Sequence, residues 1–389
     1  MKKVLSFLLV FCLLCGTAAA SVEFTKEDLL ADYDEALSIL EESFPCLPYI
    51  RQQYPNYDDM CRQGREEVLN SCDSAEGLMR ILADLFKRIG SPAHLAVVDS
   101  ESYKDYAGYY TNLYSPDAPE IRLVNDEQTR AVYASMDRNP TSAPKVTNAA
   151  SFYFSSVSYD PGRSLLYLRL PSFKSTLMER DRNILVDAVR EHPDVKHIVF
   201  DICHNTGGSD FYWEELLVAP FGERIPYTMR YYFRDTPMTR DYGKMESAVP
   251  VSSLPAEDLP PFVKELNLTY TSSQSFFVEP AEEDRIIHCD AKRWVLIDEV
   301  VFSAADEFAE FCRQTHWATL VGHTTWGDGG AVRPYLARLS RTGLLIEFTA
   351  VATANAEGLL NSLYGTNPDL PCKPSESPYD AVLRYIDME

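Results

Sequence analysis

The chain has 389 residues, of which 46% are hydrophobic and 24% charged, and its formal net charge at pH 7 is −22. This length predicts one to three structural units. So acidic a chain repels nucleic acid and anionic lipid, and neither is expected as a partner. We attribute the acidity itself to solubility.

The first 20 residues have the pattern of a cleavable secretory signal peptide. Lys2 and Lys3 form a positive start, an apolar run extends from Val4 to Leu14, and small residues lead to Ala20. That run is too short to span a bilayer, which needs about 20 apolar residues. We expect cleavage after Ala20 and a secreted, periplasmic or cell-envelope location. A permanent anchor is the alternative, and no later segment is apolar enough for a transmembrane span.

Cleavage there leaves 369 residues with a formal charge of −24, because Lys2 and Lys3 are removed. Seven cysteines remain: Cys46, Cys61, Cys72, Cys203, Cys289, Cys312 and Cys372. They form no C-x-x-C pair, so neither a structural zinc site nor another metal site is predicted. Export permits disulfides, and the first three cysteines are candidates for one. Their pairing is not determined by the sequence.

Residues 21–98 are predicted to form a small helical domain. Thr25 and Asp28 resemble a capping box at the first helix. Apolar residues recur at helical spacing in three segments, near 25–44, 58–69 and 74–90. These side chains form an ordinary core pattern, and no cofactor-binding motif is visible.

Residues 99–162 have a weaker pattern. They are rich in Tyr, Asn, Asp, Ser and Pro, with short alternating stretches such as Ile121 to Val124. We therefore interpret them as an irregular linker with a few strands.

Residues 163–389 alternate apolar strands with helices. Strands are predicted at 164–170, 197–202, 294–297 and 318–321, and helices near 181–191, 210–217 and 303–314. An aromatic and proline-rich insertion covers about 221–289. Strands separated by helices indicate βαβ units and a largely parallel sheet, so the predicted fold class is α/β.

Ser303 lies at a predicted strand-to-helix junction, where α/β sheets bind ligands. A hydroxyl there projects at a helix N-terminus, whose amides and dipole stabilise negative charge. The pattern from Ser303 to Asp306 is also that of a helix N-cap. Both interpretations are open on these residues alone.

Two further segments can be interpreted either as catalytic or as purely structural. The strand that ends near Asp201 leads to Gly207 and Gly208, which form either a tight turn or an oxyanion hole. His94 follows a helix-ending glycine, and a lone histidine is more often structural. It gains interest because a serine nucleophile needs a base that titrates near neutrality.

In order along the chain, five segments resemble motifs of the C-terminal processing (tail-specific) serine peptidases. The resemblance is strongest to the branch of the tricorn core and the interphotoreceptor retinoid-binding-protein repeats. The segments are Ala93-His94, Asp201 to Gly208, Ser303 to Asp306, Val321 to Gly327 and Gly365 to Asp369. The resemblance covers about 25–371 and implies a ClpP/crotonase-like catalytic core, a polypeptide substrate and no cofactor.

The same resemblance implies roles for individual residues. Ser303 resembles the nucleophile and His94 the general base. The amides of Ala304 and of Gly207 or Gly208 resemble the oxyanion hole. We therefore expect an exported serine-type peptidase that forms an acyl-enzyme on Ser303.

Two departures from the family pattern affect this expectation. The bacterial branch has a lysine base where this chain has Asp328, so a Ser–Lys dyad is not expected. The histidine-using branch often has an orienting glutamate where this chain has Ser362. Four carboxylates are candidates for its role: Asp99, Asp306, Asp328 and Glu357. His323 is a second candidate base, ranked below His94.

The missing glutamate supports an alternative, in which the site is degraded and the protein binds a peptide or an apolar ligand. Hydrolysis of a non-peptide ester is a third hypothesis. No PDZ domain is recognisable in 99–162, so recognition of a free C-terminus is not expected. The insertion is a candidate cover for the cleft, and the oligomeric state is not determined.

Overall fold

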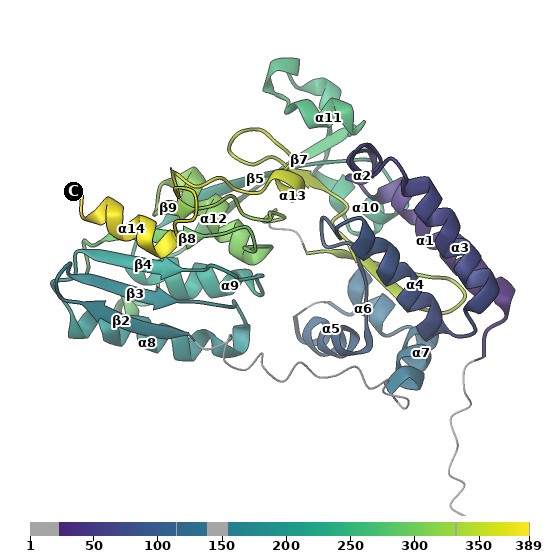
Figure 1. Ribbon diagram of the computed structural model, residues 1–389, viewed down its shortest axis with the longest axis horizontal. Helices are drawn as coiled ribbons and strands as arrows, with labels where there is room; N and C mark the ends of the chain where they lie inside the picture. The colour runs from purple at the N-terminus through teal and green to yellow at the C-terminus, as the bar shows by residue number, and fades with distance from the viewer. Residues whose placement is uncertain (1–22, 114, 138–154, 331–332, 389) are drawn as a thin grey trace, which may run out of the picture.

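The computed structural model describes residues 23–113, 115–137, 155–330 and 333–388. The predicted signal peptide and its cleavage site lie outside these residues. A sheet with its covering helices forms one half of the molecule, and the N-terminal helices form the other (Figure 1).

The first half is built on a six-stranded sheet in the order β13-β9-β8-β4-β3-β2. Neighbouring strands from β13 to β3 are parallel, and β2 is antiparallel to β3. The strands are β2 (Ser156–Asp160), β3 (Leu165–Arg169), β4 (His197–Asp201), β8 (Lys292–Ile297), β9 (Thr319–Gly322) and β13 (Leu370–Pro371). The predicted α/β class with a largely parallel sheet is confirmed.

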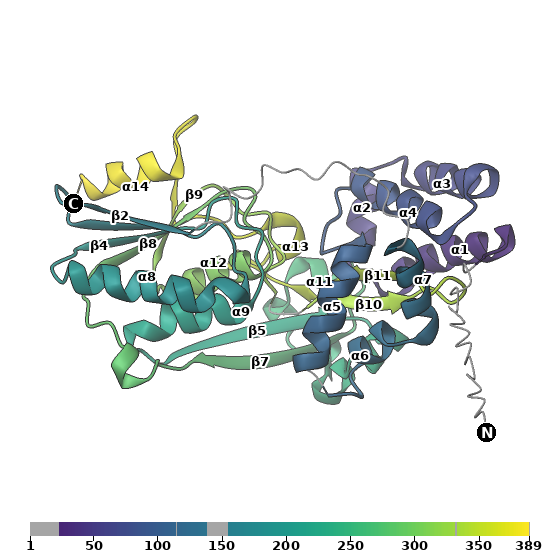
Figure 2. The same ribbon diagram turned by 90° about the horizontal axis from the view of Figure 1, so that it is seen from below.

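Helices cover both faces of this sheet (Figure 2). Because side chains alternate along a strand, Ile198 and Phe200 face one core and Val199 the other. The first core is closed by α8 (Met178–Glu191), α9 (Asp210–Tyr212) with the π-helical turns Trp213–Val218, and α12 (Ala304–Thr315). The second core is closed by α14 (Pro378–Ile386).

The predicted N-terminal helices are confirmed as α1 (Lys26–Ser43), α3 (Tyr57–Ser71) and α4 (Ala75–Arg88), with a short α2 (Leu47–Gln53) between them. The capping box is also present. The Asp28 amide donates to Thr25 Oγ1 at 3.1 Å, and the Thr25 amide donates to the Asp28 carboxylate at 3.1 Å. Two amides that a helix start leaves unpaired are thereby satisfied.

The interpretation of 99–162 as irregular with a few strands is wrong over 100–137. This part forms α5 (Ser100–Leu113), α6 (Pro119–Val124) and α7 (Glu127–Asp137). Pro119 occupies the first position of α6, where its fixed φ favours a helix. Ile121 and Val124 are buried three residues apart, on one helical face, so the apparent alternation was misleading. Residues 138–154 are outside the described part.

The insertion contributes most of a four-stranded antiparallel sheet in the order β12-β5-β7-β6. Its strands are β5 (Ile225–Phe233), β6 (Val249–Pro250), β7 (Tyr270–Val278) and β12 (Ala352–Thr353), with the short helices α10 (Pro237–Asp241) and α11 (Pro261–Glu265). The long pair β5 and β7 runs from the large sheet toward the helical half (Figure 2).

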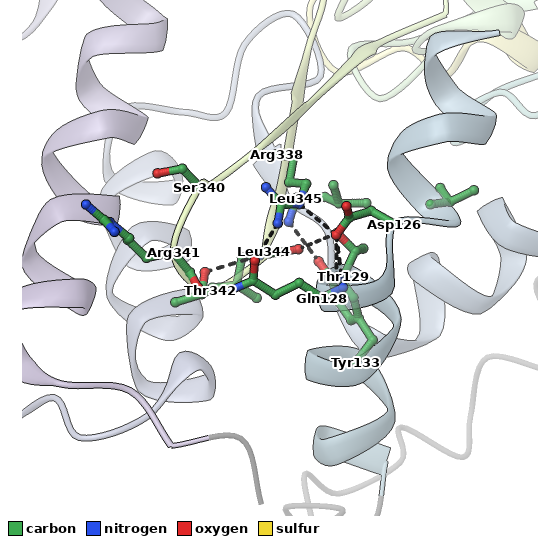
Figure 3. Close-up of polar contacts among 12 residues, drawn as sticks. Asp126, Gln128, Thr129, Tyr133, Arg338, Ser340, Arg341, Thr342, Leu344 and Leu345 are labelled. Atoms are coloured by element: carbon green, nitrogen blue, oxygen red, sulfur yellow. Dashed lines mark hydrogen bonds and ion pairs between the residues drawn. The ribbon is translucent and has the colours of Figure 1, made fainter. Parts of the chain in front are cut away.

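A third sheet joins the two halves, in the order β1-β11-β10. Its strands are β1 (Ala96–Val97), β10 (Tyr335–Arg338) and β11 (Leu345–Phe348). Figure 3 shows Arg338 donating to Asp126, at 2.9 Å, and the Leu345 amide donating to the Tyr133 hydroxyl, at 3.1 Å. The β10–β11 hairpin is thereby bound to α7 and the turn before it.

Helix α1 holds the turn of the same hairpin. The Arg341 and Thr342 amides donate to the buried carboxylate of Asp32 at 2.8 and 2.7 Å. Since β11 pairs with β1, which begins two residues after His94, the helical half determines where that histidine lies.

All seven cysteines beyond the predicted signal peptide are described, and each is a free thiol. The disulfide considered for Cys46, Cys61 and Cys72 is therefore not formed in this structure. No helix within the described ranges is long and apolar enough to cross a bilayer.

Candidate active site

Ser303 lies between β8 and α12 with φ +56° and ψ −132°, in a region that residues with a Cβ rarely adopt. Its amide donates to the Gly327 carbonyl at 3.0 Å, and its carbonyl accepts from the Glu307 amide at 2.9 Å. Its side chain makes no capping hydrogen bond to the helix. Ser303 occupies the N-cap position of α12, but the interpretation of its hydroxyl as a cap for a helix amide is wrong.

The Ser303 hydroxyl lies 2.9 Å from His94 Nε2. His94 has φ +57° in the turn between α4 and β1, and the carbonyl of the preceding Ala93 accepts from the Thr349 amide at 2.8 Å. The imidazole packs against Phe302, with ring centroids 4.5 Å apart. The structure thus brings together two residues that the sequence separates by 209 positions.

Asp328 completes this chain of side chains. Its Oδ2 is hydrogen-bonded to His94 Nδ1, and its side chain is 2% exposed. The Thr349 hydroxyl donates to Oδ2 at 3.0 Å and the Ser362 hydroxyl to Oδ1 at 2.5 Å. An ionised carboxylate only accepts, so Nδ1 carries the proton and Nε2 accepts from Ser303.

Burial by itself opposes charge on both partners, but their interaction outweighs it. For Asp328, burial raises the pKa, whereas the charge of His94 and three side-chain hydrogen bonds bring it below the usual value. For His94, burial lowers the pKa, whereas Asp328, with smaller contributions from Glu347 and Asp210, raises it above the usual value. The acid is thus ionised and the imidazole is a stronger base than usual.

The two predicted glycines differ in what their amides do. The Gly207 amide donates to Asn205 Oδ1 at 2.8 Å, so it is already engaged. Gly208 has φ +141°, and a Cβ there would lie 2.4 Å from the Phe173 carbonyl oxygen, which makes glycine necessary. The structure gives no acceptor in the described residues for the amides of Gly208 and Ala304. Gly207 packs against the start of α12, since its Cβ would meet the Ala304 nitrogen at 2.9 Å.

These groups surround a small hollow of about 80 Å³. It is lined by Gly208, Ser209, Asp210, Ser303, Ala304, Glu307, Asp328, Gly329, Arg333 and Pro334. Glu307 is 4% exposed, and burial together with the neighbouring Asp210 raises its pKa well above the usual value. The hollow therefore places the Ser303 hydroxyl, two unengaged amides and the buried Glu307 carboxyl group around one space.

The other candidate carboxylates have separate partners. Asp99 accepts from the Ser102 amide at 2.7 Å and Glu357 pairs with Arg313 at 3.1 Å. Asp306 is fully buried and accepts from the Gly329 amide and the Asn361 side chain, both at 2.9 Å. Of the four, Asp328 is the one in contact with His94.

His323, the second candidate base, has an exposed side chain, and its amide donates to the Ile297 carbonyl at 3.1 Å. The structure records no contact between this described residue and Ser303. Thr349 was not identified from the sequence, because no motif marks a threonine that follows β11 and lies 255 positions from His94. Ser362 was singled out only as a replaced glutamate.

Within the described residues, no group of three or more His, Cys, Asp or Glu side chains is placed to hold a metal ion. The residues that converge at this site are instead those of acyl transfer: a hydroxyl, an imidazole, a carboxylate and backbone amides.

Residues 164–372 match the family model described as peptidase family S41, and this match covers just over half of the chain. The chain belongs to peptidase family S41. Members of this family are serine peptidases, and the C-terminal processing peptidases are among them. The predicted family resemblance and the predicted fold class, with its ClpP/crotonase-like core, are confirmed.

Several solved structures are similar to this chain in fold. A candidate peptidase from Parabacteroides merdae ATCC 43184 is 15% identical, with 93% of this chain and 95% of that chain covered and a TM-score of 0.52. Mature CPAF is 12% identical, with coverages of 93% and 96% and a TM-score of 0.54. A structure of mature CPAF complexed with lactacystin has a TM-score of 0.53. At these identities the likeness is one of fold. No curated protein sequence matches the chain.

Proposed function

We propose that this member of family S41 is an active, exported serine peptidase that hydrolyses polypeptides through an acyl-enzyme on Ser303. The observation that carries the proposal is the hydrogen-bonded chain from Ser303 through His94 to the buried Asp328. A nucleophile, a base and a group that orients the base are the three parts that serine catalysis needs.

In the first half of the reaction, Ser303 Oγ attacks the carbonyl carbon of the scissile peptide bond. His94 Nε2 takes the hydroxyl proton, and the imidazolium that forms is stabilised by Asp328. The carbonyl oxygen gains negative charge and accepts hydrogen bonds from the Gly208 and Ala304 amides. The C–N bond then breaks, and the amine leaves with the proton from His94.

In the second half, water replaces the amine. His94 Nε2 takes a proton from that water, whose oxygen attacks the ester carbonyl of the acyl-enzyme. The same two amides stabilise the second tetrahedral intermediate. When the ester bond breaks, His94 returns the proton to Ser303 Oγ, and the carboxylic acid product leaves.

Asp328 orients His94, although it lies in a different segment of the chain from the glutamate of the family pattern. Its carboxylate comes from the segment where the bacterial branch has a lysine, and Ser362 stands where the orienting glutamate is expected. Ser362 is instead a positioning residue that donates to Asp328 at 2.5 Å. The missing glutamate is therefore compatible with activity, because the buried carboxylate of Asp328 contacts Nδ1 of His94.

Export depends on the predicted signal peptide at residues 1–20. If it is cleaved after Ala20, the substrates are polypeptides of the cell envelope or the surroundings. The binding-protein hypothesis and the ester-hydrolysis hypothesis are outcomes of the same test.

The test is covalent labelling and turnover. Wild-type protein should take up a fluorophosphonate on Ser303 and hydrolyse members of a peptide library. Ser303→Ala and His94→Ala should each lower kcat by about 10⁶, and the double variant little further, because the two groups act as a unit. Ser252→Ala, at an exposed serine, is the matched control. Lactacystin, which CPAF binds in a solved structure, is a second probe for Ser303.

Absence of both labelling and peptide hydrolysis in the wild type would reject the proposal in favour of a binding protein. Ester turnover without peptide hydrolysis would support the ester hypothesis instead.

A further inference from the structure

A second and larger cleft of about 540 Å³ lies outside the catalytic hollow. Its walls come from α2, from α11 in the insertion, and from the segment that leads into α13 (Asn361–Tyr364). Figure 1 shows these three elements close together, although they are far apart in the sequence. The volume is in the range of clefts that bind ligands, about 300–1,000 Å³.

The cleft is lined by aromatic and apolar side chains together with the polar side chains of Gln52 and Glu265, and Glu265 is the one carboxylate among these lining residues. The rings of Tyr49, Phe262 and Tyr364 line it, and the Tyr49 hydroxyl donates to the Glu265 carboxylate. Leu359 and Tyr364 are 41% and 47% exposed, so apolar surface is open to a ligand. None of the described residues that line the cleft is Lys, Arg or His. Aromatic faces beside an unbalanced carboxylate attract a cation.

One wall of the cleft is held in place by hydrogen bonds to the half with the large sheet. Asn361 donates to Asp306 at 2.9 Å and Ser362 donates to Asp328 at 2.5 Å, both from the short helix α13. Leu360 and Tyr364, on either side of these two residues, face the cleft. A ligand in the cleft therefore meets a preformed surface, which lowers the entropy that binding loses.

We propose that this cleft is an exosite that binds a Lys or Arg side chain in a part of the polypeptide substrate distant from the scissile bond. The cationic group pairs with Glu265 and lies against Tyr49 and Tyr364, while its aliphatic stem packs on Leu359. That the ligand is substrate rests on the proposed function. The charge preference rests on the cleft alone.

Both sites contact the four-residue helix α13, since Tyr364 lines the cleft and Ser362 donates to Asp328. One extended chain can therefore reach both. An extended polypeptide advances about 3.3 Å per residue, so about twelve residues span about 40 Å. Binding at the exosite raises the local concentration of the scissile bond near Ser303, which lowers KM without changing the chemical step.

The direct test measures binding to Ser303→Ala protein by fluorescence anisotropy. The probes are two labelled twelve-residue peptides that differ only at one central position, Lys in one and norleucine in the other. We expect the Lys peptide to bind about five- to tenfold more tightly, in line with a cation–π contact and one ion pair. Glu265→Gln should remove this preference, and Tyr364→Ala should weaken binding of both peptides.

Glu257→Gln is the matched control, because it makes the same charge change at an exposed position of the same insertion. It should leave the Lys preference intact. Equal binding of the two peptides, or a preference that survives Glu265→Gln, would overturn the exosite. Equal losses in Glu257→Gln and Glu265→Gln would also overturn it, since they would indicate only general electrostatic attraction.

A kinetic arm separates this proposal from the proposed function. With wild-type Ser303, Glu265→Gln should raise KM about five- to tenfold for the Lys peptide and leave turnover of p-nitrophenyl acetate unchanged. If the wild type shows no turnover but the Ser303→Ala protein binds the Lys peptide in a Glu265-dependent way, the cleft binds basic peptides and the peptidase proposal fails. If the wild type hydrolyses the Lys peptide and Glu265→Gln does not change its KM, the exosite proposal fails and the peptidase proposal stands.

Discussion

The two halves of the molecule position their parts of the active site by different means. Ser303 is held within the half that contains the large sheet: the chain turns at φ +56°, the Ser303 amide donates to the Gly327 carbonyl, and α12 begins at the next residue. His94 is set by tertiary contacts, because β1 pairs with β11 and the helical half holds the β10–β11 hairpin. Asp328 lies where the two meet, with Ser362 on one side and Thr349 on the other.

This difference has a consequence for mutations. A change at the junction of β8 and α12 acts directly on Ser303 and on the proposed oxyanion hole, whereas a change far from the site can displace His94. Ser303 then stays in place while the proposed activity is lost. Three variants test this division, from the largest expected effect to the smallest.

Asp328→Asn removes the charge at the meeting point. We expect kcat/KM to fall by about 10⁴, as when an imidazole loses its orienting carboxylate. The pH profile should also change. His94 must be neutral to act as base, and Asp328 raises its pKa, so the acid limb of the wild type lies above the ordinary histidine value of about 6.5. Without Asp328, the burial of His94 lowers its pKa, and the acid limb of the profile moves to lower pH.

The measurement is kcat/KM against pH for the wild type and Asp328→Asn. Asp99→Asn is the control, because Asp99 is the exposed carboxylate in the turn after β1 and makes no recorded contact with His94. Its profile should match the wild type. A limb that stays in place in Asp328→Asn would contradict the assignment of Asp328.

Gly208→Ala alters the loop that follows β4, in the half with the large sheet. The Cβ would lie 2.4 Å from the Phe173 carbonyl oxygen at φ +141°, so the loop must shift and move its amide away from the oxyanion. Loss of one oxyanion donor lowers kcat by about 10²–10³. Gly243→Ala is the control for backbone strain alone, because Gly243 has φ +67° and its Cβ would meet no atom closer than 3.7 Å. Pre-steady-state acylation rates check the effect.

If Gly208→Ala and Gly243→Ala lose activity equally, the oxyanion role of Gly208 is wrong. If Gly208→Ala proves unstable, the remaining folded fraction can still be titrated with the fluorophosphonate, and the rate is expressed per labelled site.

Asp32→Ala weakens the contact between the helical half and the β10–β11 hairpin, far from the candidate site. The Arg341 and Thr342 amides lose their buried acceptor, which costs about 1–3 kcal/mol for each unsatisfied group. The free energy of unfolding should fall accordingly, and kcat/KM should fall less than in the other two variants. Denaturant titration and steady-state rates measure both. Glu35→Ala removes the acceptor of the exposed Ser340 amide and should cost less than about 1 kcal/mol. Equal losses in the two variants would contradict the docking argument.

The parts of the fold that the sequence predicts are those with a local cause. The capping box at Thr25 places the first helix, and short continuous apolar runs place β3 and β4. Residues 100–137 were misread because their Tyr-rich, polar composition carries weak periodicity, and tertiary packing decided for helix. The domain boundaries after residues 98 and 162 stay predictions, as does the signal peptide.

The same division applies to the candidate site. The sequence singles out Ser303, His94 and the pair Gly207 and Gly208, because each lies in a short segment that resembles a family motif. Only the tertiary structure chooses Asp328 among four carboxylates, since 234 positions separate it from His94 and their contact depends on how the halves dock. Only the tertiary structure distinguishes the engaged amide of Gly207 from that of Gly208, because a side chain, Asn205, folds back onto one of them. Neighbouring residues determine the local conformation of the chain, whereas the packing of the whole molecule determines which distant segments come into contact.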